Sequence, residues 1–149
     1  MTARTLVDTN VLVYSYDRSE PAKQQRALET IEGLSVSAGG AVSTQVLAEF
    51  FTTAIRKLPA PLSIEDAAGR VSHYLRTWTV FDVTSRVVEE AVHGVRDYRL
   101  NYWDAQLWAV ARLHDIPLVL SEDFSDGQVL GGVRFLNPFQ SAFRLAGWL

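Results

Sequence analysis

The sequence predicts a single α/β domain, a three-layer sandwich in which a central, mainly parallel sheet lies between helices. Short apolar segments alternate with segments of helical periodicity, and this order favours parallel strands joined by crossover helices. The 149 residues suit one domain, and 48% hydrophobic with 21% charged residues is typical of a globular protein. No repeat or linker divides the chain. We therefore expect one domain over 1–149, with its core in about 5–139 and an apolar tail, 141–149, that packs against the body or a partner.

The first half of the chain carries signals for two strands and three helices. Pro21 fits the first turn of a helix because proline has no N–H to leave unpaired there; Ser19 is the candidate cap, and Gly33 the expected end. Residues 63–66 (SIED) have the layout of a capping box, which opens a further helix. In order, we expect a strand over 5–7, a helix over 21–31, a strand over 41–43, and helices over 44–58 and 63–78.

The second half continues this alternation. Beta-branched and aromatic residues predict a strand over 79–83, and apolar residues at three- and four-residue spacing predict helices over 85–98 and 103–114. Two further apolar runs, 117–120 and 133–136, predict the last strands. On the helix over 85–98, the apolar residues that we expect to share one face are Val88, Ala91, Val92 and Val95.

Charge and composition exclude some classes of function. Fourteen basic against 17 acidic residues give a net charge of −3, whereas a protein that holds nucleic acid by bulk attraction is usually strongly basic. Two bound Mg²⁺ ions, with four positive charges, would bring that net charge to +1, so metal-dependent chemistry stays open. The lack of cysteine excludes disulfides and thiolate chemistry. Because no secretory leader or membrane-length apolar run is readable, we expect a soluble, cytoplasmic protein.

Four acidic residues stand at positions that indicate a site. Asp8 follows the first predicted strand and Asp123 follows the strand over 117–120; ligands of open α/β sheets bind beyond such strand ends. These two can meet only if their strands are near neighbours. Glu49 lies in an apolar stretch where a carboxylate is costly, and Asp104 lies in the first turn of a helix, whose dipole favours its charge. Oxygen donors without cysteine or nearby histidine suit Mg²⁺ or Mn²⁺ better than zinc.

Each acid also has a purely structural interpretation. Asp8 could form a turn, Glu49 could lie at the exposed edge of its helix, and Asp104 could be an ordinary acid of a first helical turn. Asp123 and Asp126 could be solvated loop residues. The matching strand-end and helix-start positions, taken together, favour a shared site.

Four short motifs, in order, resemble the PIN-domain family: VDTNVL (7–12), AEF (48–50), YWDA (102–105) and LSEDF (120–124). The resemblance covers residue 5 to about 139 and, within the family, is similar to the VapC-type toxins of toxin–antitoxin pairs. It implies a PIN-like fold and an Mg²⁺- or Mn²⁺-dependent endoribonuclease that cleaves RNA. It further implies a homodimer and a cognate VapB-like antitoxin whose tail enters the active-site groove.

The resemblance also implies roles for individual residues. Its acidic quartet consists of Asp8, Glu49, Asp104 and Asp123. We expect Asp8 and Asp104 to bind the principal metal ion and the other two to complete the shell, orient water or admit a second ion. Ser121 matches the small hydroxyl residue two positions before the last acid, Asn10 matches the polar residue after the first, and Asp126 is a further candidate without a family counterpart.

Other residues are open to two interpretations. Three arginines are candidates for RNA-phosphate contacts or are solvated helix charges: Arg96, Arg99 and Arg112. Tyr102 or Trp103 could stack on a base, although core packing is favoured for Trp103. The three histidines lie outside the acidic motifs, and we assign them no catalytic role.

Four alternative functions remain. A non-toxin PIN nuclease that processes RNA would share every motif. A haloacid-dehalogenase-type phosphatase needs an acid where this chain has Asn10, and also a late lysine, whereas the only lysines are Lys23 and Lys57. A phospho-acceptor receiver domain likewise expects a late lysine. A non-catalytic interaction module would keep the acids without metal affinity.

Overall fold

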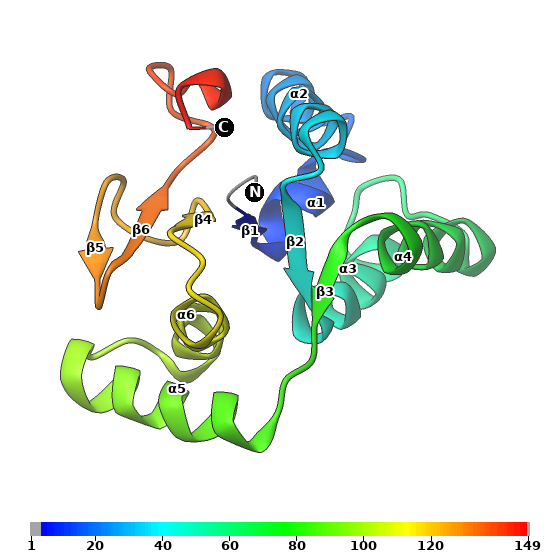
Figure 1. Ribbon diagram of the computed structural model, residues 1–149. Coiled ribbons are helices and arrows are strands. Elements are labelled where there is room, and N and C mark those ends of the chain that lie inside the picture. Colours follow the sequence, from blue (N-terminus) through cyan, green and yellow to red (C-terminus); the bar gives the residue numbers. More distant parts are fainter. Residues whose placement is uncertain (1–3, 149) are drawn as a thin grey trace.

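The computed structural model describes residues 4–148 and confirms the predicted α/β sandwich, with one six-stranded sheet between helices (Figure 1). The strands are β1 (Thr5–Val7), β2 (Gly40–Ser43), β3 (Thr79–Phe81), β4 (Leu118–Leu120), β5 (Val129–Leu130) and β6 (Val133–Leu136). Their order across the sheet is β3-β2-β1-β4-β6-β5, and every neighbouring pair is parallel except β5 with β6.

Helices cover both faces of this sheet. They are α1 (Thr9–Tyr14), α2 (Pro21–Ser37), α3 (Thr44–Arg56), α4 (Ile64–Thr77), α5 (Ser85–Tyr98), α6 (Tyr102–Leu113) and the 3₁₀ turn η1 (Leu145–Gly147). In Figure 1, α2 lies above the sheet, α5 and α6 lie below it, and α3 and α4 lie beside β2 and β3. Among residues 4–148, no helix combines the length and the apolar character that crossing a membrane requires.

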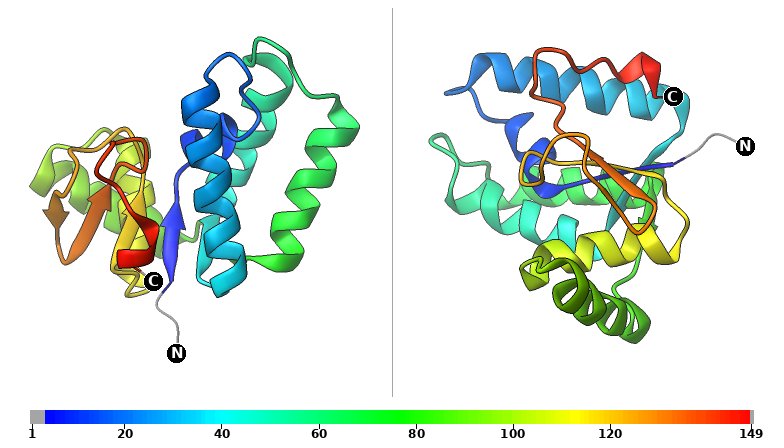
Figure 2. Two further views of the ribbon diagram at one scale, coloured as in Figure 1. Left: turned by 90° about the horizontal axis from the view of Figure 1, so that it is seen from above. Right: turned by 90° about the vertical axis from the view of Figure 1, so that its left-hand side faces the viewer.

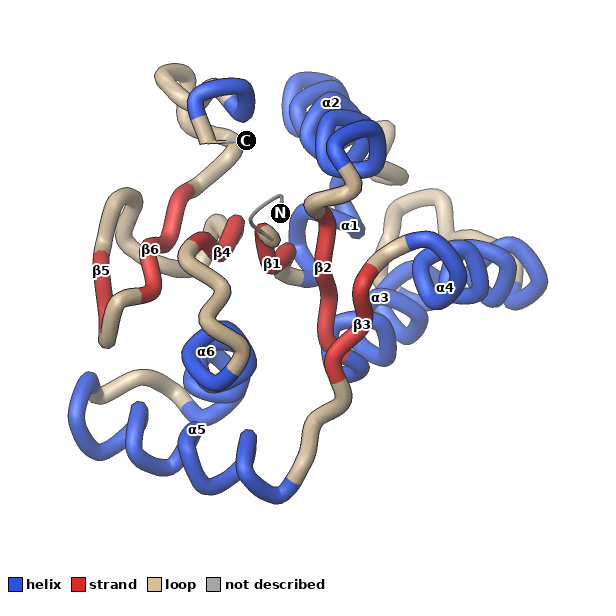
Figure 3. Tube along the Cα trace, in the orientation of Figure 1, coloured by secondary structure: helices blue, strands red, loops and turns tan. Residues whose placement is uncertain are grey.

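The order of the strands places the ends of β1 and β4 together. From β1 the chain moves outward to β2 and β3, then returns through α5 and α6 to β4 on the other side of β1 (Figure 3). In the parallel register Val7 is paired with Leu120, and the Asp8 amide N–H donates to the Leu120 carbonyl over 3.0 Å. The strand order reverses at this point, where open α/β sheets form their ligand crevices.

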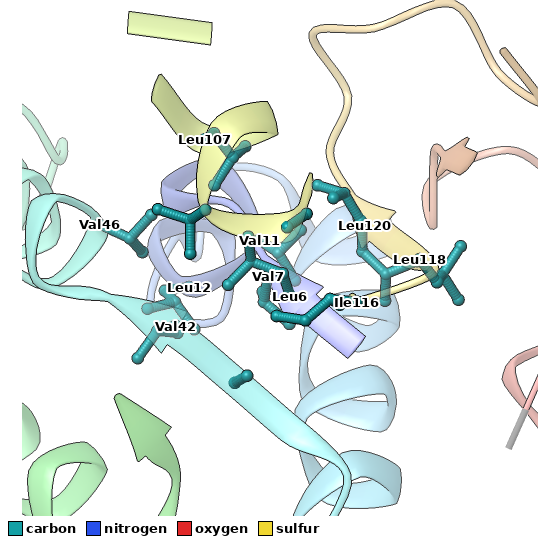
Figure 4. Packing of buried hydrophobic residues seen from close by; sticks show 14 of the residues in the cluster. Leu6, Val7, Val11, Leu12, Val42, Val46, Leu107, Ile116, Leu118 and Leu120 are labelled. Atoms are coloured by element: carbon teal, nitrogen blue, oxygen red, sulfur yellow. The ribbon is translucent and has the colours of Figure 1, made fainter. Parts of the chain in front are cut away.

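A close-packed apolar core supports these strand ends. Leu6, Val7 and Leu120 of the two central strands are fully buried, together with Val11 and Leu12 of α1 (Figure 4). Because well-packed cores deform little, the corner between β1 and α1 holds the residue between them, Asp8, in a fixed place.

Two local predictions differ from the structure, and two short elements were not predicted. Helix α2 does not end at Gly33 but continues to Ser37, with Ala38 as its C-cap at a φ of 58°; Gly33 instead lies against the Leu145 side chain. Ser19 does not cap α2: its hydroxyl donates to Asp17, and the cap position is Glu20, without a side-chain hydrogen bond. The apolar residues after Asp8 form α1, and the short strand β5 was not predicted.

The apolar pattern of α5 is also divided differently from the prediction. Val87, Ala91 and Gly94 form its buried face, whereas Val88, Val92 and Val95 are exposed. The absence of a side chain at Gly94 decides this, since a Cβ there would lie 2.8 Å from the ring of Trp108 on α6. The close approach of the two helices therefore selects the small-residue face.

The C-terminal tail lies along α2 (Figure 2). Phe143 is buried, its carbonyl accepts a 3.0 Å hydrogen bond from Arg26, and Leu145 packs at Gly33. Leu149, the end of the predicted tail, lies outside the described residues, as do residues 1–3 of the predicted domain.

Gly40 should be intolerant of a side chain. A Cβ at this buried strand position would lie 2.7 Å from the Trp78 ring, so we expect Gly40→Ala to lower the free energy of unfolding by about 1–3 kcal/mol through overpacking. Gly69, in the exposed interior of α4 with open space around it, is the matched control; Gly69→Ala should raise that free energy by about 0.5–1 kcal/mol. Urea denaturation measures both, and equal effects of the two variants would contradict the packing argument.

Candidate active site

A pocket of about 360 Å³ collects all four predicted acids from four separate segments. Asp8 comes from the end of β1, Glu49 from α3, Asp104 from α6 and Asp123 from the loop after β4. Asn10 also lines this pocket. Asp8 and Asp123 can meet only if their strands are near neighbours, and β1 and β4 are indeed paired directly.

Asp8 is the buried member of the group, with 8% of its surface exposed. As the N-cap of α1, its carboxylate accepts a 2.7 Å hydrogen bond from the Thr9 amide and a 2.6 Å bond from the Ser121 hydroxyl. Burial is the main cause that raises the pKa of Asp8 to about 7. The two hydrogen bonds lower this pKa, and the negative charges of Asp123 and Asp104 raise it further. The carboxyl thus binds a proton near neutral pH unless a cation stabilises its charge.

Neutral donors link Asp8 to Asp123. The Asn10 side-chain amide lies between them, 3.4 Å from one carboxylate and 3.2 Å from the other. The Ser121 hydroxyl, which donates to Asp8, accepts a 3.1 Å hydrogen bond from the Asp123 amide. The two auxiliary residues predicted from the motifs therefore both contact the acids.

Asp104 is fixed at the start of α6. Asn101 caps this helix by accepting from the Asp104 amide over 3.0 Å, and its own amide donates back to the Asp104 carboxylate. Partial burial raises the pKa of Asp104; the Asn101 hydrogen bond opposes this, and the charges of Asp123 and Glu49 add to it. The acids are thus close enough to repel one another.

Glu49 ends a chain of hydrogen bonds that sequence reasoning missed. It accepts from Thr9 over 3.0 Å and from Gln45 over 2.8 Å. Gln45 in turn accepts from Gln106 over 2.6 Å, and Gln106 accepts from the Tyr102 hydroxyl over 2.8 Å. Gln106 is buried within the apolar run of α6, between Ala105 and Leu107, and that anomaly in the sequence could have indicated it.

A second missed group fastens the loop that carries Asp123. The Lys23 ammonium donates to Glu122 over 3.0 Å and to the Tyr14 hydroxyl over 3.2 Å, while Tyr14 donates to the other oxygen of Glu122 over 3.0 Å. The hydrogen bond from Lys23 to Glu122 is the main cause of a raised pKa at Lys23. This group ties α1 and α2 to the residue before Asp123.

Some predicted residues lie elsewhere. Asp126 does not line the pocket; its carboxylate accepts a 2.8 Å hydrogen bond from the Asn137 amide and fastens a loop. Arg96, Arg99 and Arg112 are exposed away from the pocket, and Arg96 pairs with Asp97. Of the basic residues in 4–148, Lys57 alone lines the pocket.

The core position favoured for Trp103 is wrong. The residue is 62% exposed and lines the pocket, whereas the side of α6 that meets Gly94 of α5 carries Ala105 and Trp108.

The donor set fits a hard divalent cation, although the acids are not gathered around one point. Within residues 4–148, no three Asp, Glu or His side chains are close enough to form a metal-binding group. Neutral hydrogen-bond donors, not basic side chains, contact Asp8 and Asp123, and none of the ion pairs among residues 4–148 includes Asp8. A buried carboxylate with a raised pKa and no basic partner, among further oxygen donors, suits Mg²⁺ or Mn²⁺.

Comparison with known proteins assigns the fold and the family. The family model of the PIN domain matches residues 5–125, which include all four acids. The chain belongs to the PIN-domain family. No protein with a curated description matches it at a significant level.

Several solved structures share the fold of this PIN domain. A toxin–antitoxin complex from Klebsiella pneumoniae has 20% identity and a TM-score of 0.65, over 90% of this chain and 97% of that chain. DNA-bound VapBC from Salmonella typhimurium has 13% identity and a TM-score of 0.64, over 92% and 99%. A sarcin–ricin-loop-cleaving VapC toxin from Mycobacterium tuberculosis has 20% identity and a TM-score of 0.55, over 77% and 86%.

The raised pKa of Asp8 predicts how stability depends on pH. The folded metal-free protein holds the Asp8 proton up to about pH 7, whereas the unfolded chain releases it near 3.8, so the free energy of unfolding falls as pH rises between these values. At pH 8 the charged Asp8 carboxylate lowers the free energy of unfolding by up to about 4 kcal/mol, and Asp8→Asn removes this penalty.

Urea denaturation in EDTA at pH 5 and pH 8 measures this cost. The loss of stability between the two pH values should be smaller in Asp8→Asn than in the wild type and unchanged in Asp126→Asn, whose carboxylate lies outside the pocket. A loss as large in Asp8→Asn as in the wild type would contradict the assignment of the raised pKa.

Proposed function

We propose that this PIN domain is an Mg²⁺- or Mn²⁺-dependent endoribonuclease and the toxin of a type II toxin–antitoxin pair. The observation that carries the proposal is the shared pocket of four carboxylates around the buried Asp8. Family membership supports nuclease chemistry, and one structure of the same fold is described as a toxin that cleaves the sarcin–ricin loop.

Asp8 and Asp104 would hold the principal cation, and Glu49 and Asp123 would complete its shell, orient water or hold a second ion. When bound, such an ion supplies a water of lowered pKa and positive charge beside the leaving oxygen of a phosphodiester. The surrounding residues orient the ligands: Ser121 and the Thr9 amide hold Asp8, and Asn101 holds Asp104. Gln45 and the Thr9 hydroxyl hold Glu49 in the same manner.

The charge of the pocket makes RNA binding depend on the cation. The four acids are joined there by Asp17 and Glu122, and Lys57 is the one basic residue of the described chain that lines the pocket. Such a pocket repels a polyanion until divalent cations offset its charge. Chelation should therefore weaken both the binding and the cleavage of RNA.

Cleavage of a structured RNA in the presence of Mg²⁺ or Mn²⁺ tests the activity. Asp8→Asn and Asp104→Asn should each lower the cleavage rate by about 100-fold or more, beyond the 10–100-fold typical when a residue that supports a metal ligand is replaced. Asp126→Asn is the matched control, because it removes a carboxylate that fastens a loop outside the pocket. Cleavage that survives EDTA, or persists in both active-site variants, would refute the mechanism.

We further propose a VapB-like antitoxin and a second copy of the chain as partners. Two of the structures with this fold are described as a toxin–antitoxin complex and as DNA-bound VapBC. The protein also exposes apolar surface that partners can bury: Val88, Val92 and Val95 on α5, and a groove between α3 and α4 that includes Phe51 and Leu75.

Expression in a bacterial host tests the assignment as a toxin. The wild-type chain should arrest growth, Asp104→Asn should not, and co-expression of a small DNA-binding protein from the neighbouring reading frame should restore growth. Colony counts and growth curves measure this, with western blots to show equal expression. RNA cleavage in vitro without growth arrest would instead favour a non-toxin PIN nuclease.

A further inference from the structure

Trp103 presents an aromatic ring at the wall of the acidic pocket. It is 62% exposed, lies next to Asp104 in the first turn of α6, and lines the pocket. Tyr102 packs against its ring edge to face, with centroids 5.1 Å apart and planes at 78°, and the Tyr102 hydroxyl is itself fixed by Gln106. The indole thus has a fixed aromatic neighbour and keeps a large solvent-exposed surface.

The same pocket is also lined by a polar stripe along α3 and its C-cap. Gln45, Glu49, Thr53 and Lys57 follow one another at four-residue intervals, and all four line the pocket. At 1.5 Å per residue, the stripe is about 18 Å long, so the pocket extends well beyond the acids. It ends at Lys57, which is exposed and takes part in none of the ion pairs found among residues 4–148.

We propose that Trp103 is a stacking platform for an unpaired nucleobase next to the scissile phosphate, and that Lys57 binds a backbone phosphate of the same strand. This inference rests on the proposed nuclease function and specifies its substrate as a single-stranded RNA segment. Aromatic rings stack unpaired bases of any sequence, whereas bases within a duplex have no free face to offer. The site therefore selects loops and single strands before it selects sequence.

The surroundings of Trp103 favour a nucleotide over a protein side chain. The indole shares its pocket with Asp104, Glu49 and Asp123, and an apolar protein surface seated on it would strip water from those carboxylates without replacing their hydrogen bonds. A nucleotide places a flat ring on the indole and a phosphate near the acids, where the divalent cations needed for cleavage offset both sets of charges.

An abasic scan of a short single-stranded RNA tests the platform. Binding is measured by fluorescence anisotropy with Ca²⁺ in place of Mg²⁺, and the length of the RNA is checked after each titration. For the wild type, one abasic position should weaken binding by about 5- to 100-fold, the range expected for one base–aromatic stack. Trp103→Ala should weaken binding of the intact RNA by the same factor, and the abasic position should then have no further effect on its affinity.

Four further variants separate stacking from other effects. Trp103→Phe should restore most of the affinity, while Trp103→Leu should not, because leucine is apolar but has no aromatic face. Trp148→Ala removes a tryptophan that is 44% exposed beside Arg134, outside the pocket, and should bind as the wild type does. Lys57→Ala should weaken binding to all sequences alike and reduce the salt slope of log affinity by about 1.

The outcomes distinguish this inference from the proposed function. A flat abasic scan, or wild-type binding by Trp103→Ala, would overturn the platform even if RNA is cleaved. A change of oligomeric state in Trp103→Ala, seen by sedimentation while RNA binding is unchanged, would overturn it in favour of a protein interface. A position-specific abasic effect that vanishes in Trp103→Ala would support the platform even if no cleavage occurs, and would then refute only the proposed nuclease activity.

Discussion

The parallel pairing of β1 with β4 is the constraint on which the candidate site depends. These strands are far apart in the chain, yet their register places Val7 beside Leu120, so that Asp8 and the loop carrying Asp123 leave the sheet together. The Asp8 amide is tied to the Leu120 carbonyl, and the core beneath both strands is fully buried. Asp8 and Asp123 are thus positioned by the buried centre of the sheet, which suits a site that must hold its side chains in a fixed geometry.

The cost of this arrangement is mainly the burial of a carboxylate, and repulsion between the acids adds to it. Burial raises the pKa of Asp8 to about 7, and the charges of Asp123 and Asp104 act in the same direction. Ser121, Asn10 and the Thr9 amide offset part of this cost with hydrogen bonds, but none of them carries a positive charge. The same feature that lowers stability at high pH would favour binding of a divalent cation, because such an ion would stabilise the charged form that the pocket otherwise disfavours.

The sequence predicted the helices better than it predicted which face of each helix is buried. The caps and periodicities that predicted α4 and α6 are local properties, and the structure contains both helices close to their expected bounds. Gly33 and α5 show where such reasoning ends. A glycine can end a helix or leave room for a neighbouring side chain, and at Gly33 the contact with Leu145 shows the second case. On α5, either the valine face or the small-residue face could be buried, and the contact with Trp108 shows that the small-residue face is the buried one.

By itself, the sequence determined the α/β class and the identity of the four acids. Strand and helix periods are read over a few residues, and a carboxylate in an apolar stretch is conspicuous without any partner in view. The tertiary structure alone decided that the acids share a pocket with Lys57, that Asp126 and the three arginines stay outside it, and that Trp103 faces solvent. Those outcomes depend on which segments meet across the sheet, and contacts between distant segments leave no pattern in the local sequence.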